Sequence, residues 1–422
     1  MTASPSPVAA RRDRGWRSLL AVGLFAFAVR AGYVLTQEPW PLRGDALGYH
    51  QFAVSVLERG EYRGPHGVAS RPPGYPLFLA AVYAAFGEGL RPVQLVQCVL
   101  GSLSVVMIMA MSGRWLPGAW PLAVGLFAAC FYGLVEPCRA MMAECLYAFL
   151  TALAWLLLTS GGRGPGLRVV GAGAVTGLAA LVRPEGLLIG GAALAVGAAT
   201  RPRLWRPATA ALGILALGAM LAPWAARNWK ALGKPVAGST NGSYNLYLGL
   251  YLPLEAMGLE RDRRFLVEGL PELEADRVYG REFRALARRT PPSKFVLAYV
   301  FNAATHFYPF LPGYDLTFML LLPFWLGGMA LAWSRPELRP AAAGALVSIA
   351  VYTVFGGPVS RYRHSHAALQ MLLGSAALAV LLEAGPPWRR LAAGWAAANA
   401  AVWALAPALR QAALWLRDAV FR

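Results

Sequence analysis

The chain has 422 residues, of which 57% are hydrophobic and only 14% are charged. Its mean hydropathy of +0.47 is higher than that of ordinary soluble domains, so the composition predicts a protein whose main solvent is lipid. The formal net charge of +18 does not indicate nucleic-acid binding, because the basic residues are scattered in short segments between apolar stretches rather than gathered on a polar domain.

About eleven apolar stretches approach the roughly 20 residues that a helix needs to cross a bilayer. We place them at 18–36, 92–112, 118–135, 144–160, 168–182, 184–200, 207–224, 315–333, 340–356, 367–383 and 391–409. The arginines before the first stretch are not followed by a small-residue cleavage site, so we expect a retained first helix with its N-terminus in the cytoplasm. The predicted fold is an all-α, polytopic integral membrane protein.

The loops between these stretches differ in charge on the two sides of the membrane. The loops assigned to the cytoplasm are short and almost purely basic, as the positive-inside rule requires. Two long connections, 37–91 and 226–314, lie on the other side and carry most of the acidic residues. We therefore expect an N-terminal transmembrane catalytic module over 1–225, an outer loop region over 226–314, and C-terminal transmembrane helices over 315–422. The chemistry should face the outer side of a cell membrane, the inner membrane in a two-membrane cell.

The first outer loop is predicted to contain two further helices. Residues 45–59 read as an amphipathic helix with Asp45 as its N-cap and with Phe52, Val56 and Leu57 on one face. Residues 71–87 are apolar, but they are short and led by two prolines. We interpret them as a re-entrant or surface-lying helix, because a further crossing here would invert every later loop and break the charge rule.

Two carboxylates stand at predicted outward ends of helices. Asp45 and Tyr49 are spaced i, i+4, so both side chains lie on one face of the helix. A carboxylate there could accept a proton from a hydroxyl nucleophile or hold a divalent cation, although a plain N-cap also explains Asp45. Glu144 opens a long apolar helix, where it either interacts favourably with the helix dipole or acts as a second active-site carboxylate.

Four arginines are candidates for gripping a phosphate, because a guanidinium group binds phosphate with a planar, bidentate fork. They are Arg71, Arg183, Arg361 and Arg363. Tyr362, His364 and His366 lie beside the last two. We do not favour a metal at the two histidines, since no carboxylate is near them in sequence. If a metal binds at all, we expect Asp45 to be its ligand.

The stretch 241–251 is rich in tyrosine and asparagine. Asn241, Tyr244 and Asn245 would suit sugar hydroxyl groups through hydrogen bonds and stacking. Tyrosines also anchor proteins at the membrane interface, and the sequence leaves these two interpretations open.

Taken in order, these motifs resemble the GT-C class of glycosyltransferases that use polyprenyl-phosphate sugars, which includes protein mannosyltransferases and lipid A aminoarabinose transferases. The resemblance covers nearly the whole chain. The motifs are Val29-Arg30-Ala31, Gly44-Asp45-Ala46-Leu47-Gly48-Tyr49, Arg71-Pro72-Pro73-Gly74-Tyr75-Pro76, Glu144, Arg183-Pro184-Glu185-Gly186, Pro223-Trp224, Arg227-Asn228, the stretch 241–249, and Arg361-Tyr362-Arg363. Each motif is weak alone, and their order and common sidedness make the resemblance specific.

The resemblance implies transfer of a sugar from an undecaprenyl- or dolichyl-phosphate carrier to a lipid, glycan or protein hydroxyl on the outer face, with inversion at the anomeric carbon. Asp45 would be the catalytic base or a metal-associated acid, with Glu144 as the second carboxylate in place of the aspartate common there. The four arginines would bind the donor phosphate. The expected substrate-binding residues are Tyr49, Tyr75, Asn241, Tyr244, Asn245 and Tyr362. The cofactor stays open between none and a divalent cation, Mg²⁺ or Mn²⁺.

Two other functions fit the composition. A transporter or lipid-carrier flippase would show paired halves and charges near the membrane midplane, whereas the charges here lie at one rim. A non-catalytic scaffold has no reason to align a carboxylate with several arginines. We therefore favour the enzyme, with membrane lipid around it and no nucleic-acid partner.

Overall fold

The computed structural model describes residues 7–38, 42–159, 165–200, 206–260, 267, 269–310, 313–357 and 360–421. These residues form helices, joined by turns and two isolated bridges, and they contain no strand. The predicted all-α class is confirmed.

Every predicted span coincides with a helix. These helices are α1 (Pro7–Thr36), α4 (Leu90–Ser112), α5 (Trp120–Cys130) with α6 (Tyr132–Val135), α7 (Glu144–Thr159), α8 (Pro165–Val182), α9 (Glu185–Thr200), α10 (Pro207–Leu232), α14 (Leu316–Leu331), α15 (Arg339–Phe355), α16 (Ala367–Ala384) and α17 (Pro387–Phe421). Among the described residues, five helices are long and apolar enough to cross a membrane, or six if the bent segment Trp120–Cys138 is one span. The protein is thus a multi-pass membrane protein, and the count of eleven spans stays a prediction.

Small residues let neighbouring helices touch backbone to backbone. A Cβ atom at Gly173 in α8 would lie 2.0 Å from the carbonyl oxygen of Gly213 in α10, and one at Gly177 would lie 2.7 Å from that of Leu217. Close approach at small residues is how helices gain packing energy in lipid, where the hydrophobic effect does not drive them together. Larger side chains at these glycines would therefore separate α8 from α10.

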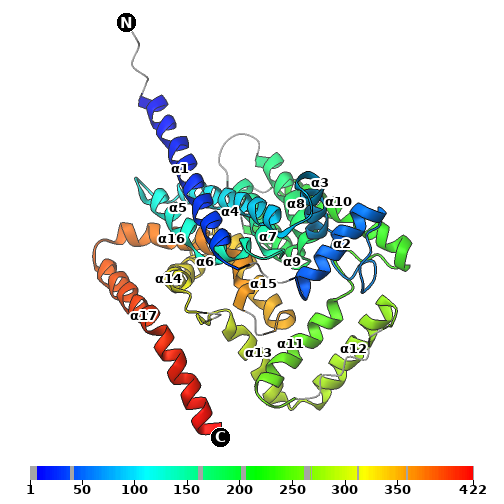
Figure 1. Cartoon of the computed structure of the whole chain (residues 1–422). Helices are drawn as coiled ribbons and strands as arrows, with labels where there is room; N and C mark the ends of the chain where they lie inside the picture. The colour runs from blue at the N-terminus through cyan, green and yellow to red at the C-terminus, as the bar shows by residue number, and fades with distance from the viewer. Residues whose placement is uncertain are drawn as a thin grey trace.

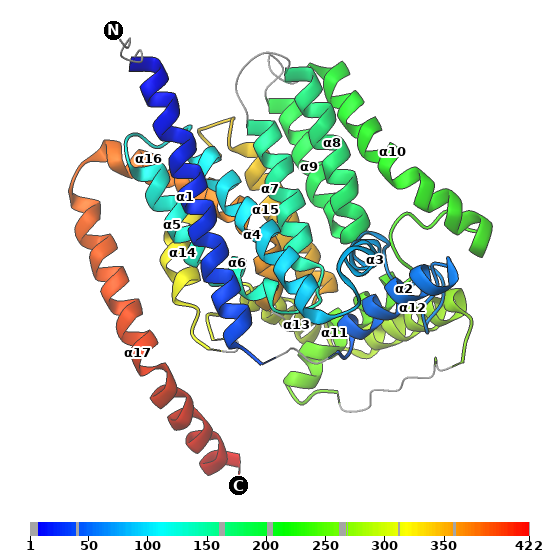
Figure 2. The same cartoon turned by 45° about the horizontal axis from the view of Figure 1, so that its top comes forward.

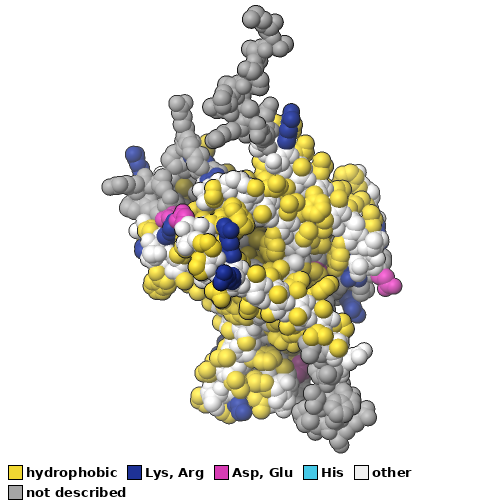
Figure 3. Space-filling model, turned by 90° about the vertical axis from the view of Figure 1, so that its left-hand side faces the viewer, with side chains coloured by type: hydrophobic (Ala, Val, Ile, Leu, Met, Phe, Trp, Pro, Cys, Tyr) yellow, Lys and Arg dark blue, Asp and Glu magenta, His cyan; other side chains and the backbone are white. Residues whose placement is uncertain are grey.

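The outer surface of the helix bundle is apolar. Figure 3 shows one face on which hydrophobic side chains cover most of the described surface and charged groups are few. Leu20, Leu24 and Phe25 of α1 are 53%, 62% and 43% exposed, and Trp403 of α17 is 56% exposed. Apolar side chains turned outward at this density suit contact with lipid tails rather than water.

The two long connections fold together at one end of the bundle (Figures 1 and 2). The first contains α2 (Asp45–Arg59) and α3 (Gly74–Phe86), and the second contains α11 (Gly242–Ala256), α12 (Glu272–Arg289) and α13 (Pro292–Thr305). The 13 residues of α3 are too few to cross a bilayer, in keeping with the short helix predicted there.

Two details of α2 differ from prediction. Asp45 is the first residue of the helix rather than its N-cap; the cap is Gly44, whose φ of 58° favours glycine. The buried face is also rotated, because α2 packs on α3 through Tyr49 and Ala53. Phe52 is buried as predicted, whereas Leu57 is 46% exposed.

Candidate active site

The first component of the site is an ion pair between the two loop-one motifs. The Nη2 atom of Arg71 lies 2.7 Å from Oδ1 of Asp45, and the side chains are 25% and 38% exposed. Asp45 opens α2, and Arg71 precedes the two prolines that lead into α3, so the packing of α2 on α3 brings the two charges together. The sequence placed these residues in one site, and the structure brings them into contact.

Tyr49 links this pair to the rest of the site. The Arg71 guanidinium lies 5.7 Å from the centre of the Tyr49 ring, and Tyr75 packs edge-on against the same ring at 5.0 Å. Burial lowers the pKa of Arg71, but the charges of Asp45, Tyr49 and Tyr244 outweigh it and leave that pKa above its usual value. Burial, reinforced by Asp45, raises the pKa of the Tyr49 phenol. Tyr49 therefore acts as a neutral hydroxyl group here.

The second component is Arg183, held between two carboxylates. Its Nη1 lies 3.0 Å from Oε1 of Glu144, and its Nε donates a 2.5 Å hydrogen bond to Oε1 of Glu185. Arg183 follows the last residue of α8, while Glu144 and Glu185 open α7 and α9. Two helix N-termini thus present carboxylates, which their dipoles favour, to an arginine at the end of a third helix.

Two tyrosines cover the Arg183 guanidinium. Tyr352 of α15 and Tyr362 of η2 (Ser360–His366) stack at 4.7 Å with an interplanar angle of 7°. Arg183 lies 5.7 Å and 5.3 Å from their ring centres, and the Tyr352 hydroxyl donates a 2.6 Å hydrogen bond to Glu185. An arginine stacked on aromatic rings keeps its plane fixed, which suits a bidentate grip on an anion.

The two components are neighbours. The Tyr49 hydroxyl interacts electrostatically with Asp45 and Arg71, and also with Arg183 and Glu144. Tyr49 is therefore within electrostatic range of both ion pairs. One candidate site, where the end of α8 meets the first residues of α7 and α9, contains the predicted Asp45, Arg71, Glu144 and Arg183 together with Tyr49, Tyr75 and Tyr362.

The second long connection bonds to the first through Glu272, a carboxylate for which the sequence predicted no role. Glu272, the first residue of α12, accepts hydrogen bonds from the backbone N–H groups of Val68 and Ala69 at 2.7 and 2.9 Å, and from the Thr240 hydroxyl at 2.5 Å. Arg227 donates to the carbonyl groups of Tyr62 and Val68. These bonds hold the segment that leads to Arg71. Glu272 lies in a charged stretch of sequence, where no spacing distinguishes it.

The remaining predicted residues are dispersed. Tyr244 comes within electrostatic reach of Arg71 and packs on Tyr279 at 4.9 Å. Asn241 is the N-cap residue of α11, and the Asn245 side chain is exposed. The side chain of Arg361 lies outside the described residues.

Arg363 forms a separate, buried ion pair. Its Nη2 lies 2.8 Å from Oδ2 of Asp315, with side chains only 2% and 1% exposed, and its Nη1 donates to the Tyr308 carbonyl group at 2.6 Å. Its neighbour Tyr362 turns to Arg183 instead. The structure therefore does not bring Arg363 to the Arg183 cluster, and its phosphate role stays a prediction.

Few of the described residues are placed to serve as metal ligands. Among the described residues, no group of three or more His, Cys, Asp and Glu is arranged to hold one. Asp45 contacts Arg71. The carboxylate of Glu136 lies 3.8 Å from Nδ1 of His364, although the two residues are far apart in the sequence. These residues do not form the oxygen-rich set that Mg²⁺ or Mn²⁺ prefers, and we derive no step through a metal.

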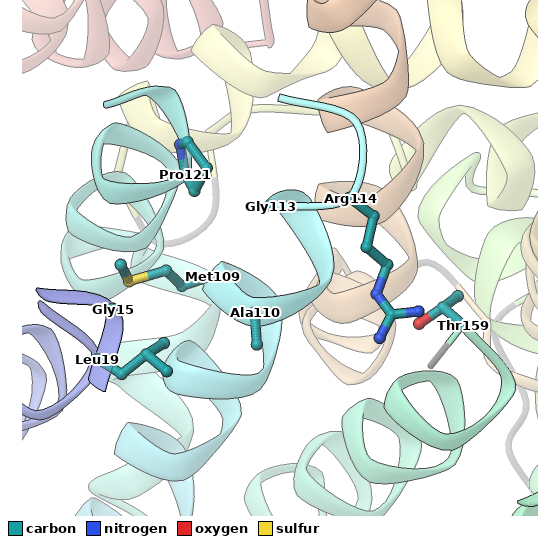
Figure 4. Close-up of a pocket in the computed structure, with 8 residues that line it drawn as sticks. All are labelled: Gly15, Leu19, Met109, Ala110, Gly113, Arg114, Pro121 and Thr159. Atoms are coloured by element: carbon teal, nitrogen blue, oxygen red, sulfur yellow. The ribbon is translucent and has the colours of Figure 1, made fainter. Parts of the chain in front are cut away.

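One pocket lies away from these ion pairs. A pocket of about 690 Å³ is lined by Gly15, Leu19, Met109, Ala110, Gly113, Arg114, Pro121 and Thr159 (Figure 4). Glu144 begins α7 and Thr159 ends it, and a helix of this length spans about 24 Å. The pocket is therefore at the opposite end of the bundle from the ion pairs.

Residues 70–226 match the family model described as dolichyl-phosphate-mannose-protein mannosyltransferase. This range includes Arg71, Glu144 and Arg183 but not Asp45. No protein of curated function matches the chain in sequence.

Two solved structures show the fold. The oligosaccharyltransferase of Archaeoglobus fulgidus with a tethered acceptor peptide has a TM-score of 0.53 at 13% identity, over 87% of this chain and 50% of that one. The AglB oligosaccharyltransferase of the same organism, with an inhibitory peptide and a dolichol-phosphate, has a TM-score of 0.52 at 15% identity, over 94% and 54%. This chain spans about half the length of those solved chains. The chain shares the fold of these oligosaccharyltransferases, and residues 70–226 match the mannosyltransferase family model, in agreement with the GT-C resemblance seen in its sequence.

Proposed function

We propose that the protein transfers a sugar from a polyprenyl-phosphate carrier to a hydroxyl group of a lipid, glycan or protein acceptor on the outer face of the cell membrane, with inversion at the anomeric carbon. The observation that carries this proposal is the Asp45–Arg71 ion pair, with Tyr49 packed against Arg71 and within electrostatic range of the Arg183–Glu144 pair. The similar solved structures hold an acceptor peptide in one case and a dolichol-phosphate in the other.

In the proposed reaction, the acceptor oxygen attacks the anomeric carbon and the bond from that carbon to the phosphate oxygen breaks. The electron pair leaves with the carrier phosphate, and the acceptor proton passes to Asp45. Arg71 and Arg183 offset the charge that develops on the phosphate, which is the largest demand of such a step. No covalent nucleophile is needed, because the phosphate is already a competent leaving group.

The ion pairs leave N–H groups of both arginines available to the donor phosphate. Arg71 uses Nη2 for Asp45, and Arg183 uses Nη1 and Nε for its carboxylates. Because an arginine has five N–H donors, both retain donors for a phosphate. When the phosphate draws Arg71 toward itself, the Asp45 carboxylate gives up this ion pair and can take the acceptor proton. Donor binding thus prepares the base.

The charges of the two ion-paired groups indicate that the donor phosphate needs a further cation. Asp45, Glu144 and Glu185 outnumber Arg71 and Arg183 by one. An anionic phosphate would add to this excess, so donor binding requires another cation close by. Arg361, next to Tyr362 in the chain, is our candidate, and a divalent cation brought with the donor is the alternative.

We further propose that eleven helices cross the bilayer and that the ion pairs face outward, away from the basic loops. Cysteines introduced at the exposed Asn245 and Glu337, in a chain with the exposed Cys130 replaced by alanine, would test this. A membrane-impermeant maleimide should label position 245 from outside and position 337 only after the membrane is opened. Labelling of 337 alone from outside would invert the topology.

The function is tested with purified protein in lipid, radiolabelled polyprenyl-phosphate sugars and a membrane extract as the source of acceptors. The native chain should transfer label, Asp45→Asn should not, and Glu58→Gln should behave as the native chain, because Glu58 is an exposed carboxylate on the same helix. Undiminished transfer by Asp45→Asn would remove the assignment of the base. Movement of the carrier across the bilayer without transfer from any donor would favour a flippase.

A further inference from the structure

Four arginines form a continuous stripe along one face of α12. Arg277, Arg281, Arg284 and Arg288 are all exposed, and they recur at intervals of four, three and four residues. Residues at this spacing lie one above the other on a helix. We call these four residues the arginine stripe.

The opposite face of α12 is buried. Tyr279 and Leu286 are 9% and 1% exposed and pack, with Phe283, in the apolar cluster shared with α11. Two carboxylates of α12 also turn inward, since Glu272 binds the first loop and Asp276 accepts a 3.0 Å hydrogen bond from the Ser243 N–H group. Glu272 and Asp276 therefore serve contacts within the protein, while the arginine stripe faces out together with the exposed Glu274 and Glu282.

The helix that follows adds an exposed apolar face. In α13, Val296, Leu297, Val300 and Phe301 are 60%, 44%, 57% and 38% exposed. Figure 2 shows α12 running crosswise to α8 and α9 at the end of the bundle where the long connections meet. A row of exposed arginines, followed in the chain by a helix with exposed apolar side chains, matches the pattern of a segment that lies at a lipid interface.

We propose that the arginine stripe binds the phosphate groups of anionic lipids at the surface of the membrane in which the protein is embedded. Guanidinium groups grip phosphate oxygens in a bidentate manner, and each basic group near an anionic surface adds to the attraction. The exposed side chains of α13 favour lipid over a soluble anion, because they can insert among acyl chains beside the headgroups.

This binding would reach the candidate active site through Glu272. The same helix that carries the stripe holds Val68 and Ala69, close in the chain to Arg71. Docking of α12 on the membrane surface therefore steadies the segment that positions Arg71. The binding step itself does not depend on the proposed glycosyltransferase activity.

The test compares the full-length protein in nanodiscs of phosphatidylcholine with and without phosphatidylglycerol. The first readout is the phosphatidylglycerol retained in native mass spectra, and the second is the unfolding temperature. A variant with Arg277→Gln, Arg281→Gln, Arg284→Gln and Arg288→Gln keeps good helix formers and loses the charge. The matched control replaces the same four residues by lysine, which keeps the charge.

Phosphatidylglycerol should raise the unfolding temperature of the native and lysine forms, and the glutamine form should bind it about tenfold more weakly or worse. Added salt should weaken the effect in the native protein, a check that needs no variant. Unchanged phosphatidylglycerol binding by a folded glutamine variant, or a native response that ignores salt, would overturn the proposal. Stabilisation by soluble polyphosphate but not by phosphatidylglycerol would also overturn it, and would identify the stripe as a site for a polyanionic acceptor.

Discussion

Arg183 and Arg363 are two buried arginines with opposite surroundings. Arg363 meets one carboxylate, Asp315, which also accepts hydrogen bonds from Phe318 N–H and the Thr317 hydroxyl at the start of α14. This pair is closed, with 2% and 1% of its side chains exposed. Arg183 meets two carboxylates and two aromatic rings and keeps 13% of its side chain exposed.

The comparison teaches that burial and ion pairing alone do not identify a functional arginine. The Arg363 pair joins η2 to α14 and is almost fully buried. The Arg183 cluster lies beside the more open Asp45–Arg71 pair, through Tyr49. We infer that the closed pair serves the fold and the open pairs serve chemistry.

Asp45→Asn should give the largest effect on activity and little effect on the fold. The amide keeps the size of the side chain but cannot take the acceptor proton, so the transfer rate should fall about 10²- to 10⁴-fold. Transfer assays and thermal unfolding of the same samples would measure both quantities. If the variant instead unfolded while keeping its rate per folded molecule, Asp45 would be a structural residue like Asp315.

Arg363→Leu should have the reverse effects, a large loss of stability and little direct effect on activity. It leaves Asp315 buried without its ion pair, which costs about 3–5 kcal/mol of stability. The double variant Arg363→Leu, Asp315→Leu should recover much of that loss, because no lone charge remains. Thermal unfolding in detergent would follow both, and a stable Arg363→Leu protein that fails only in donor binding would return this arginine to the site.

Arg183→Lys tests the open cluster. A lysine keeps the charge but cannot bond Glu144 and Glu185 as a fork or present a planar group to the rings of Tyr352 and Tyr362. We expect transfer to fall roughly 10- to 100-fold, the equivalent of one or two charge-assisted hydrogen bonds. Steady-state rates at saturating and limiting donor would show it, and native rates with lysine would exclude a bidentate role.

Glu272→Gln should have the smallest effect. Glutamine has one accepting oxygen and its NH₂ group accepts no hydrogen bond, so it cannot take all three bonds from Val68, Ala69 and Thr240, and the segment before Arg71 loosens. We expect a several-fold rise in the apparent KM for donor with a smaller change in kcat. Glu274→Gln, an exposed neighbour on the same helix, is the control; an equal effect in both would remove the positioning role.

The sequence predicted the helices well because hydropathy in lipid is a strong local signal. Each apolar run became a helix, and the two prolines before Gly74 shortened the segment that follows them. The sequence also predicted that Asp45 and Arg71, and Glu144 and Arg183, belong to one site, because all four stand at ends of helices on the same side.

Other parts of the site were beyond local signals. The motif Arg361-Tyr362-Arg363 does not show which arginine turns inward, because that depends on Asp315, 48 residues away along the chain. Tyr352 is a single tyrosine in an apolar helix, and its bond to Glu185 exists only because α15 packs against α9. The N-cap assignment of Asp45 was wrong because Arg71 offered a stronger partner than the helix backbone.

The central claim, that the open pairs bind the donor phosphate, is tested most directly by the structure of the protein with undecaprenyl phosphate bound in nanodiscs. We predict a phosphate density within hydrogen-bond distance, about 3 Å, of both Arg71 and Arg183, with Asp45 separated from Arg71. A phosphate bound beside Arg114 in the pocket at the other end of the bundle, with both ion pairs unchanged, would contradict the account.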